Sequence, residues 1–322
     1  MSAIHLMPRP NLFVVGAMKA GTTALYSCLR SNPQIYMSPV KEPNFFSDDL
    51  WAVSSHIRVL RNEEIEQLVL SGSGVAHNAL IKNSHQYQLL FPMSSQAYAY
   101  RGETSPSYLR SRNAALNIST ICPDAKIIAI IRDPIERAWS HFLMERNESR
   151  VPYRFRDLIR QEVAEERKGK ISQHGILESG LYYRMLSRFY DHFAPSSILI
   201  IDYCDLADIQ KVFKKLDCFL GLSECCYTIT SEANRTIIPR YPLANYLLAS
   251  WGLKKLTRKI FPRQLIDMGK SKYYFRPTKA DTMSADDMAY MLSYYAQDVK
   301  SLVEKIMSQS PPKWAEKYLS IS

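Results

Sequence analysis

With 322 residues and a mass of 37.1 kDa, the chain can hold one large domain or two small ones, and its 46% hydrophobic and 22% charged residues are ordinary for a globular protein. No stretch approaches the roughly 18 uninterrupted apolar residues of a membrane span, so we expect no transmembrane segment. The net charge of +10 suits nucleic acid, anionic lipid or an anionic small ligand, but no zinc-finger or RNP-type motif accompanies it, so we expect a small phosphate-bearing ligand and no nucleic acid.

The first predicted elements are a strand, a glycine-containing turn and a helix, in the stretch FVVGAMKAGTTAL (Phe13 to Leu25). Residues 12–15 form a short apolar run typical of a buried strand, and residues 22–30 contain good helix formers, with Thr22 or Thr23 as N-cap. A strand that turns into a helix directs backbone N–H groups and the positive end of the helix dipole at one point. The sequence therefore predicts an anion site here.

This turn does not match a nucleoside-triphosphate loop. That loop has two glycines five residues apart, followed directly by Lys and then by Ser or Thr. Gly16 and Gly21 have the required spacing, but Thr22 stands where the lysine would be. The lysine of this turn is Lys19, two residues before Gly21. The turn can thus bind an anion without the triphosphate geometry, or it can be an ordinary strand-to-helix turn with a solvated lysine.

Two polar motifs follow along the chain. KEPNFF covers residues 41–46, and GETSPSYL covers residues 102–109, at the end of a strand predicted over 97–102. Glu42 lies in the loop after the first helix, where a carboxylate can remove the proton from an attacking hydroxyl; a surface Lys–Glu pair is the alternative. The rest of segment 50–100 reads as irregular, with helix-like stretches.

A second buried strand is predicted over residues 126–131, within KIIAIIRDPIERAWSHF (Lys126 to Phe142). In an open parallel sheet the ligand lies beyond the carboxyl ends of the strands, so we expect Arg132 near Lys19. The planar guanidinium of Arg132 suits a phosphate, and Ser140 lies two turns into the following helix. Asp133 precedes a proline and is interpreted as a helix cap, not as a magnesium ligand. A salt-bridged helix start is the alternative for Arg132 and Ser140.

The remaining pattern alternates strands and helices. A third buried strand is predicted over residues 197–201, and helices over 135–146, 155–167, 181–192, 206–220, 244–259 and 285–307. Residues 222–282 are rich in Arg, Lys, Tyr and Pro and are interpreted as a partly irregular lid. The alternation predicts an α/β fold, with a central parallel β-sheet flanked by helices, as a single domain over residues 1–322 with irregular insertions.

Taken together, the motifs resemble those of one family. GAMKAGTTAL looks like the 5′-phosphosulfate loop, and IIRDPIERAWSHF like the 3′-phosphate motif, of sulfotransferases that use 3′-phosphoadenosine 5′-phosphosulfate. KEPNFF and GETSPSYL are similar to motifs of the branch that contains the heparan sulfate sulfotransferases and many bacterial carbohydrate and natural-product sulfotransferases. The resemblance implies a P-loop-like fold and covers nearly the whole chain, weakly at GLYYRMLSRFYDHF (residues 180–193).

The resemblance also implies a donor site. Lys19 would act at the leaving-group oxygen, and the 5′-phosphate would be cradled by Ala20, Gly21, Thr22 and Thr23. The 3′-phosphate would be bound by Arg132 and Ser140. Tyr182 would reach the same side or pack under its helix. The basic stretch with Lys270 and Lys272 would be a lid over the nucleotide or a solvated loop.

On the acceptor side, the resemblance implies that Glu42 is the general base. His141 is a competing base, although a structural hydrogen bond suits its place in the helix better. The other acceptor-side candidates are Lys41, Glu103 and Ser105. The heparan sulfate enzymes have a lysine where this chain has Thr104, which weakens the expectation of a heparan-like acceptor. Glu103 would bind the acceptor or hold the loop.

We therefore expect an enzyme that moves a sulfuryl group to an acceptor hydroxyl of a carbohydrate or secondary metabolite and releases adenosine 3′,5′-bisphosphate. The alternatives are a P-loop-type small-molecule kinase and a non-enzymatic polyanion-binding protein. No metal is expected, because the six cysteines are scattered without metal-ligand spacing. Reduced cysteines and the lack of a secretory signal pattern predict a cytoplasmic protein.

Overall fold

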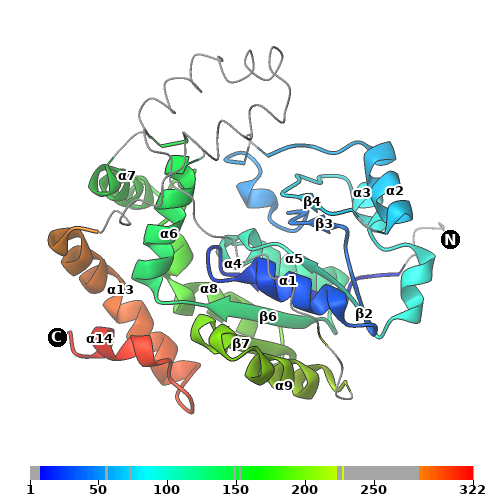
Figure 1. The fold of residues 1–322 in the computed structure, drawn as a ribbon. Coiled ribbons are helices and arrows are strands. Elements are labelled where there is room, and N and C mark those ends of the chain that lie inside the picture. Colours follow the sequence, from blue (N-terminus) through cyan, green and yellow to red (C-terminus); the bar gives the residue numbers. More distant parts are fainter. Residues whose placement is uncertain are drawn as a thin grey trace, which may run out of the picture.

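A computed structural model describes residues 8–54, 57–72, 74–147, 150–151, 154–222, 227 and 283–321. It confirms the predicted fold class, a central parallel sheet flanked by helices (Figure 1). The sheet has five strands in the order β2-β5-β1-β6-β7. Their bounds are β1 Leu12–Gly16, β2 Ile35–Met37, β5 Tyr100–Thr104, β6 Lys126–Ile131 and β7 Ile198–Asp202.

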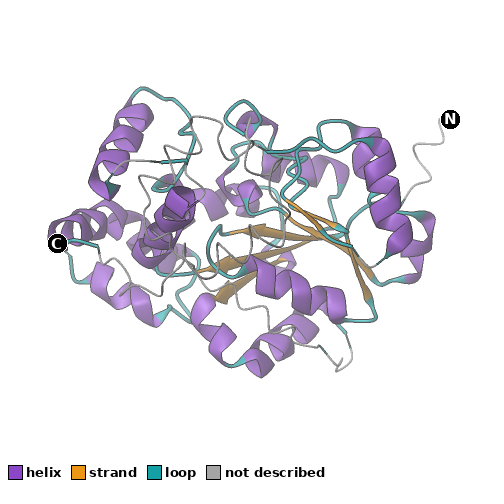
Figure 2. Ribbon diagram, turned by 45° about the horizontal axis from the view of Figure 1, so that its top comes forward, coloured by secondary structure: helices purple, strands orange, loops and turns teal. Residues whose placement is uncertain are grey.

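β1 is the central strand, and all of its residues are buried. It pairs in parallel with β5 on one side, where Phe13 lies opposite Glu103, and with β6 on the other, where Val14 lies opposite Ile128. Continuous apolar runs are typical of strands that are covered on both faces, and helices lie on both faces of this twisted sheet (Figure 2). The carboxyl ends of all five strands therefore meet at one edge.

The helices follow the predicted alternation. The longer ones are α1 Thr22–Ser31, α2 Asn62–Ser71, α5 Ala114–Ile121, α6 Pro134–Asn147, α7 Phe155–Arg167, α8 Tyr182–Tyr190, α9 Ile209–Leu220 and α13 Ala285–Lys305. The shorter ones are α3 Ser84–Leu89, α4 Ser107–Arg110 and α14 Glu316–Leu319, and the 3-10 helices are η2 Asp48–Leu50, η3 Met93–Ala97, η4 Glu178–Gly180, η5 Pro195–Ser197, η6 Tyr203–Ala207 and η8 Lys313–Ala315. None of the helices in the described ranges is long and apolar enough to cross a bilayer.

Two apolar cores hold these elements together. The larger one surrounds the sheet, and the smaller one lies between α6, α7, α13 and α14, which gather on one side of the molecule in Figure 1. Asp298 of α13 accepts hydrogen bonds from the backbone N–H groups of Tyr183 (2.9 Å) and Arg184 (3.0 Å) at the start of α8. Helix α13 thereby caps α8 and fixes the second core against the sheet.

Segment 50–100 is irregular, as predicted, and it includes the short strand β4 Ala76–His77, which pairs in parallel with β3 Val40–Lys41 in a small second sheet. The strand predicted over 97–102 runs over Tyr100–Thr104 instead, so the GET residues belong to the strand and not to the loop after it. The helix predicted over 206–220 begins at Ile209, because Asp208 caps it there through the N–H group of Lys211. The helix predicted over 244–259 lies outside the described residues, as does the lid predicted over 222–282 except for positions 222 and 227.

Candidate active site

The loop between β1 and α1 ends in a helix N-terminus that has no side-chain cap. The N-cap is Gly21, with φ 98°, and not Thr22 or Thr23 as predicted. A glycine takes this left-handed conformation without strain, and a Cβ at position 21 would lie only 2.6 Å from Leu206 Cδ1. Because the cap has no side chain, the N–H groups of the first turn stay available for an anion.

The same loop is anchored to the neighbouring strand. The N–H group of Ala17 donates to the Ile130 carbonyl of β6 (2.6 Å), and that of Ala20 donates back to the Ala17 carbonyl (3.1 Å). Lys19 is half-buried, with φ 65°, at the tip of this tight turn. The backbone therefore fixes the turn independently of a ligand. Thr22 is buried and Thr23 half-buried at the start of α1.

Arg132 follows the adjacent strand and lies near this turn. Its guanidinium donates to Glu136 Oε2 from Nε (3.2 Å) and Nη2 (3.0 Å), and it lies over the ring of Tyr203, 4.6 Å from the centroid. The same Tyr203 ring would be 3.3 Å from a Cβ at Gly21. The Tyr203 ring therefore lies beside both of the motifs that are predicted to bind an anion. It comes directly after the third buried strand, and that position was the only signal of it in the sequence.

Asp133 caps α6, as predicted. Its Oδ1 accepts from the N–H groups of Ile135 (2.9 Å) and Glu136 (3.3 Å) and from the hydroxyl of Tyr318 (2.9 Å). Its other oxygen pairs with Lys317. The carboxylate is thus used in fixing the helix start, and no cluster of metal-ligating side chains is present among the described residues.

Two roles were left open for Tyr182, reaching the 3′-phosphate side or packing under its helix, and its position favours packing. The side chain is buried, and its hydroxyl donates to the carbonyl of Arg132 (2.7 Å) and accepts from the N–H group of the same residue (3.3 Å). Tyr182 thereby fixes the backbone that carries the arginine. Ser140 is half-buried on α6, two turns beyond Arg132.

His141 is buried beside Arg137, whose Nη1 is 3.4 Å from His141 Nδ1. Burial lowers the pKa of His141 well below its ordinary value, and the charges of Arg137, Arg110 and Lys19 lower it further. The imidazole is therefore neutral at pH 7. The effect of Lys19 on His141 also shows that the first loop and α6 lie close together.

The KEPNFF motif forms a tight loop at the end of β5. The Glu42 N–H group donates to the Thr104 carbonyl (2.8 Å), and both Glu42 and Asn44 have positive φ (66° and 54°). The Glu42 side chain is 18% exposed and pairs with Lys41, whose side chain is buried. Asn44 Nδ2 donates to the carbonyls of Glu42 (2.7 Å) and Ala79 (3.0 Å). The loop thus presents one partly exposed carboxylate from a rigid backbone.

Glu103 and Ser105, two of the acceptor-side candidates, lie inside the protein. Both are 0% exposed, and Glu103 accepts from the hydroxyls of Tyr87 (2.8 Å), Tyr108 (2.6 Å) and Ser105 (2.7 Å). Burial raises the pKa of Glu103 to about 7, while the three hydrogen bonds oppose that rise. Of the two roles left open for Glu103, its position favours holding the loop.

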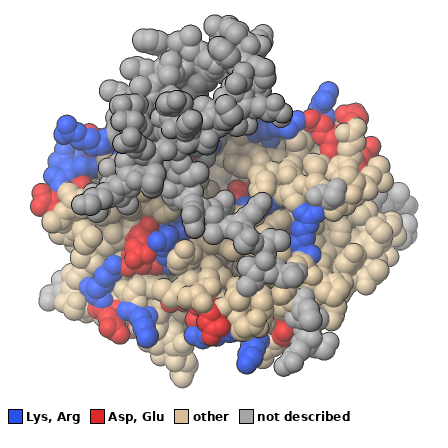
Figure 3. Space-filling view, viewed as in Figure 1, with Lys and Arg blue, Asp and Glu red and all other residues tan. Residues whose placement is uncertain are grey.

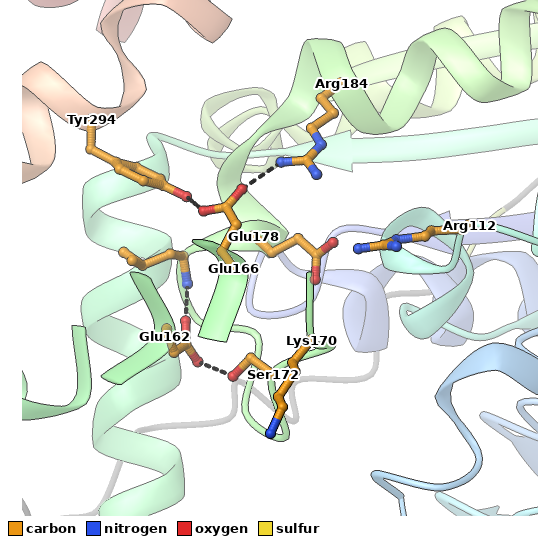
Figure 4. Close-up of a pocket in the computed structure, with 9 residues that line it drawn as sticks. Arg112, Glu162, Glu166, Lys170, Ser172, Glu178, Arg184 and Tyr294 are labelled. Carbon is orange, nitrogen blue, oxygen red and sulfur yellow. Dashed lines mark hydrogen bonds and ion pairs between the residues drawn. The ribbon is translucent and has the colours of Figure 1, made fainter. Parts of the chain in front are cut away.

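A separate pocket involves α7, α8 and α13 and contains none of the predicted site residues (Figure 4). Its carboxylates are engaged: Glu166 accepts from Arg184 (2.7 Å) and from Tyr294 (2.9 Å), and Glu162 accepts from the N–H group of Leu177 (2.7 Å). We therefore interpret it as a packed ion cluster between helices.

Lys270 and Lys272 lie outside the described residues. On the face in Figure 3, basic and acidic side chains of the described residues are interspersed.

Comparisons with known proteins agree with these motifs. The family model described as "Sulfotransferase family" matches residues 10–224. The human protein named bifunctional heparan sulfate N-deacetylase/N-sulfotransferase 3 is 26% identical over 320 residues, which is 96% of this chain and 31% of that protein. The membrane-associated sulfotransferase kil1 of Dictyostelium discoideum is 31% identical over 163 residues, 49% of this chain and 29% of that protein. The chain thus spans about a third of the length of these relatives.

A solved structure shows the same fold. The sulfotransferase from Alicyclobacillus acidocaldarius superposes with a TM-score of 0.63 at 23% identity, over 93% of this chain and 96% of that one. Because the family model covers well over half of the chain, and includes the two anion-binding loops and the KEPNFF and GETSPSYL motifs, this protein belongs to the sulfotransferase family.

Proposed function

We propose that this sulfotransferase moves the sulfuryl group from 3′-phosphoadenosine 5′-phosphosulfate to an acceptor hydroxyl. The observation that carries the proposal is the pairing of two anion sites at one edge of the sheet. The uncapped start of α1 and the Arg132 guanidinium both lie beside the ring of Tyr203. A nucleotide with phosphate groups at both its 5′ and 3′ positions fits two such sites, whereas a nucleoside triphosphate would leave the second one without a phosphate.

The residues present suit such a donor. The first-turn N–H groups after Gly21, with the hydroxyls of Thr22 and Thr23, would hold the 5′-phosphate, and Arg132 with Ser140 the 3′-phosphate. The donor supplies an activated sulfuryl group on a good leaving group. The ammonium of Lys19 would offset the charge that grows on the leaving oxygen.

Glu42 is the base that the geometry favours. An attacking hydroxyl must lose its proton as its oxygen bonds to sulfur, and a carboxylate within hydrogen-bond reach can accept it. The Glu42 side chain is 18% exposed, whereas that of His141 is 3% exposed and surrounded by α6 partners. The Glu42 carboxylate is paired with the buried ammonium of Lys41, which holds it at the end of the loop.

For the acceptor, we propose a hydroxyl of a carbohydrate or a secondary metabolite. The relatives named for heparan sulfate support a saccharide. The chain differs from the heparan sulfate enzymes at Thr104, which is buried and neutral where they have a lysine. This difference argues for an acceptor other than heparan sulfate itself.

The donor site is tested by a thermal-shift titration with adenosine 3′,5′-bisphosphate, ADP, ATP with magnesium, and heparin. A ligand at 100 times its Kd stabilises the folded protein by about 2.7 kcal/mol. We expect the bisphosphate to raise the Tm most, because it alone has a 3′-phosphate. Stabilisation by ATP with magnesium alone would indicate a kinase, and stabilisation by heparin alone a polyanion-binding protein. Transfer from a ³⁵S-labelled donor to a panel of sugars, phenols and alcohols would then identify the acceptor.

A further inference from the structure

The buried carboxylate of Glu103 has no part in the chemistry described so far. It lies at the end of β5, is 0% exposed, and accepts three hydrogen bonds from hydroxyl groups. Its neighbours come from several elements: Tyr87 from α3, Tyr108 from α4, and the thiol of Cys122 after α5. Taking a carboxylate out of water is costly, so a buried one needs such partners.

Two of these hydroxyls also reach the loop that carries Glu42. Ser105 Oγ accepts from the N–H group of Asn44 (3.2 Å). The Tyr108 hydroxyl accepts from the N–H groups of Phe45 (3.1 Å) and Phe46 (3.4 Å). Three consecutive backbone N–H groups of the KEPNFF loop are thus bound by hydroxyls that donate their own protons to Glu103.

This loop needs such support because its backbone is strained. Glu42 and Asn44 both have left-handed φ values, which residues with a Cβ rarely adopt. A conformation of this kind persists only where the surroundings fix it. Each hydroxyl has a single proton and donates it in a hydrogen bond to Glu103, so the oxygen lone pairs of Ser105 and Tyr108 point to the loop N–H groups.

We propose that Glu103 is the positioning residue for the base: through Ser105 and Tyr108 it orients the hydroxyls that hold residues 44–46, and so fixes where the Glu42 carboxylate lies. The inference rests on the proposed role of Glu42. It assigns Glu103 no contact with the acceptor, since the side chain is 0% exposed.

The chain offers a matched pair of variants. Tyr108→Phe and Tyr87→Phe each remove one buried hydroxyl that donates to Glu103 Oε1, at 2.6 Å and 2.8 Å. Only the Tyr108 hydroxyl also binds loop N–H groups. A purely structural role of the cluster predicts similar effects of the two changes, whereas positioning through the loop predicts different ones.

Hydrogen exchange of the protein without ligand reads the loop directly. We expect the amides of Phe45 and Phe46, which lose their acceptor, to exchange at least about tenfold faster in Tyr108→Phe and to be unchanged in Tyr87→Phe. Equal exchange in the two variants overturns the proposal. If Tyr108→Phe does not fold, Ser105→Ala replaces it, because that hydroxyl also bridges Glu103 and the loop.

Turnover supplies the second readout, with ³⁵S-labelled donor and the acceptor that the panel of sugars, phenols and alcohols identifies. A base displaced by about 1 Å costs on the order of 10²-fold, so kcat should fall about 10- to 100-fold in Tyr108→Phe, with bisphosphate affinity unchanged, and by less than about threefold in Tyr87→Phe. Equal losses in kcat overturn the positioning role. Failure of the wild type to bind the bisphosphate, or full activity of Glu42→Gln, instead overturns the proposed function, and the exchange measurement still decides on the loop.

Discussion

Replacing Glu103 by glutamine should remove a pH dependence of stability that this one buried group creates. Burial raises the folded-state pKa of Glu103 from its ordinary value of 4.5 to about 7. Between these two values the unfolded chain has lost the proton while the folded chain keeps it, so stability falls as the pH rises through this window. The shift of about 2.5 units corresponds to about 3 kcal/mol, at 1.36 kcal/mol per unit. Glutamine is close in shape and does not titrate.

The measurement is the free energy of unfolding of wild type and Glu103→Gln, from urea titrations at pH 4.5, 6, 7 and 8. We expect the difference between the two proteins to change by about 3 kcal/mol over this range, with the wild type losing stability relative to the variant as the pH rises. Asp298, whose burial raises its pKa to about 6, titrates in both proteins and cancels in the difference. Burial keeps Tyr87, Tyr108 and Cys122 protonated throughout. If the two free energies of unfolding changed with pH in parallel, Glu103 would not be the buried titrating group that the structure shows.

Three further substitutions test the donor site and the base. Lys19→Ala should lower turnover by about 10²–10³, the usual cost of losing one preorganised donor at a developing charge, and unchanged turnover in a chemistry-limited assay would remove Lys19 from the mechanism. Arg132→Ala should weaken the binding of adenosine 3′,5′-bisphosphate by about 1.5–3 kcal/mol in calorimetry, whereas the control Glu136→Gln should not weaken binding. Equal affinities in the two variants would contradict the 3′-phosphate assignment. Glu42→Gln should keep bisphosphate affinity and lower the rate of transfer by about 10²–10⁴-fold, and a variant with the wild-type rate would show that the base lies elsewhere.

The strands and most helices could be predicted because their signals are local. Residues 126–131 are one uninterrupted apolar run, and the structure has a strand over the same residues; the helix over 155–167 is likewise as predicted. The N-cap of α1 was predicted wrongly, because Thr22 has good capping chemistry but Gly21 alone fits the left-handed turn under Leu206. Local propensity therefore yielded to a contact with a residue far along the chain.

The parts of the site that could not be predicted all depend on contacts between distant segments. The burial of Glu103 by hydroxyls from α3 and α4, and the position of the Tyr203 ring beside both Gly21 and Arg132, depend on how distant segments pack. A single sequence gives the residue types but does not place the tyrosine at position 87 against the carboxylate at position 103. The turn between β1 and α1 could be predicted because strand, turn and helix are consecutive in the sequence.

The Arg132–Glu136 pair has a consequence for nucleotide choice. The guanidinium is already matched by a carboxylate four residues along α6, and the two side chains are 23% and 59% exposed. Such an exposed pair is worth about 0–1 kcal/mol, so a doubly charged phosphate can displace the carboxylate at little cost. A ribose hydroxyl cannot, because it offers no charge in exchange. With Arg132 in its proposed role, the Glu136 carboxylate would be an exchangeable counterion, and it would lower the affinity for nucleotides that lack a 3′-phosphate.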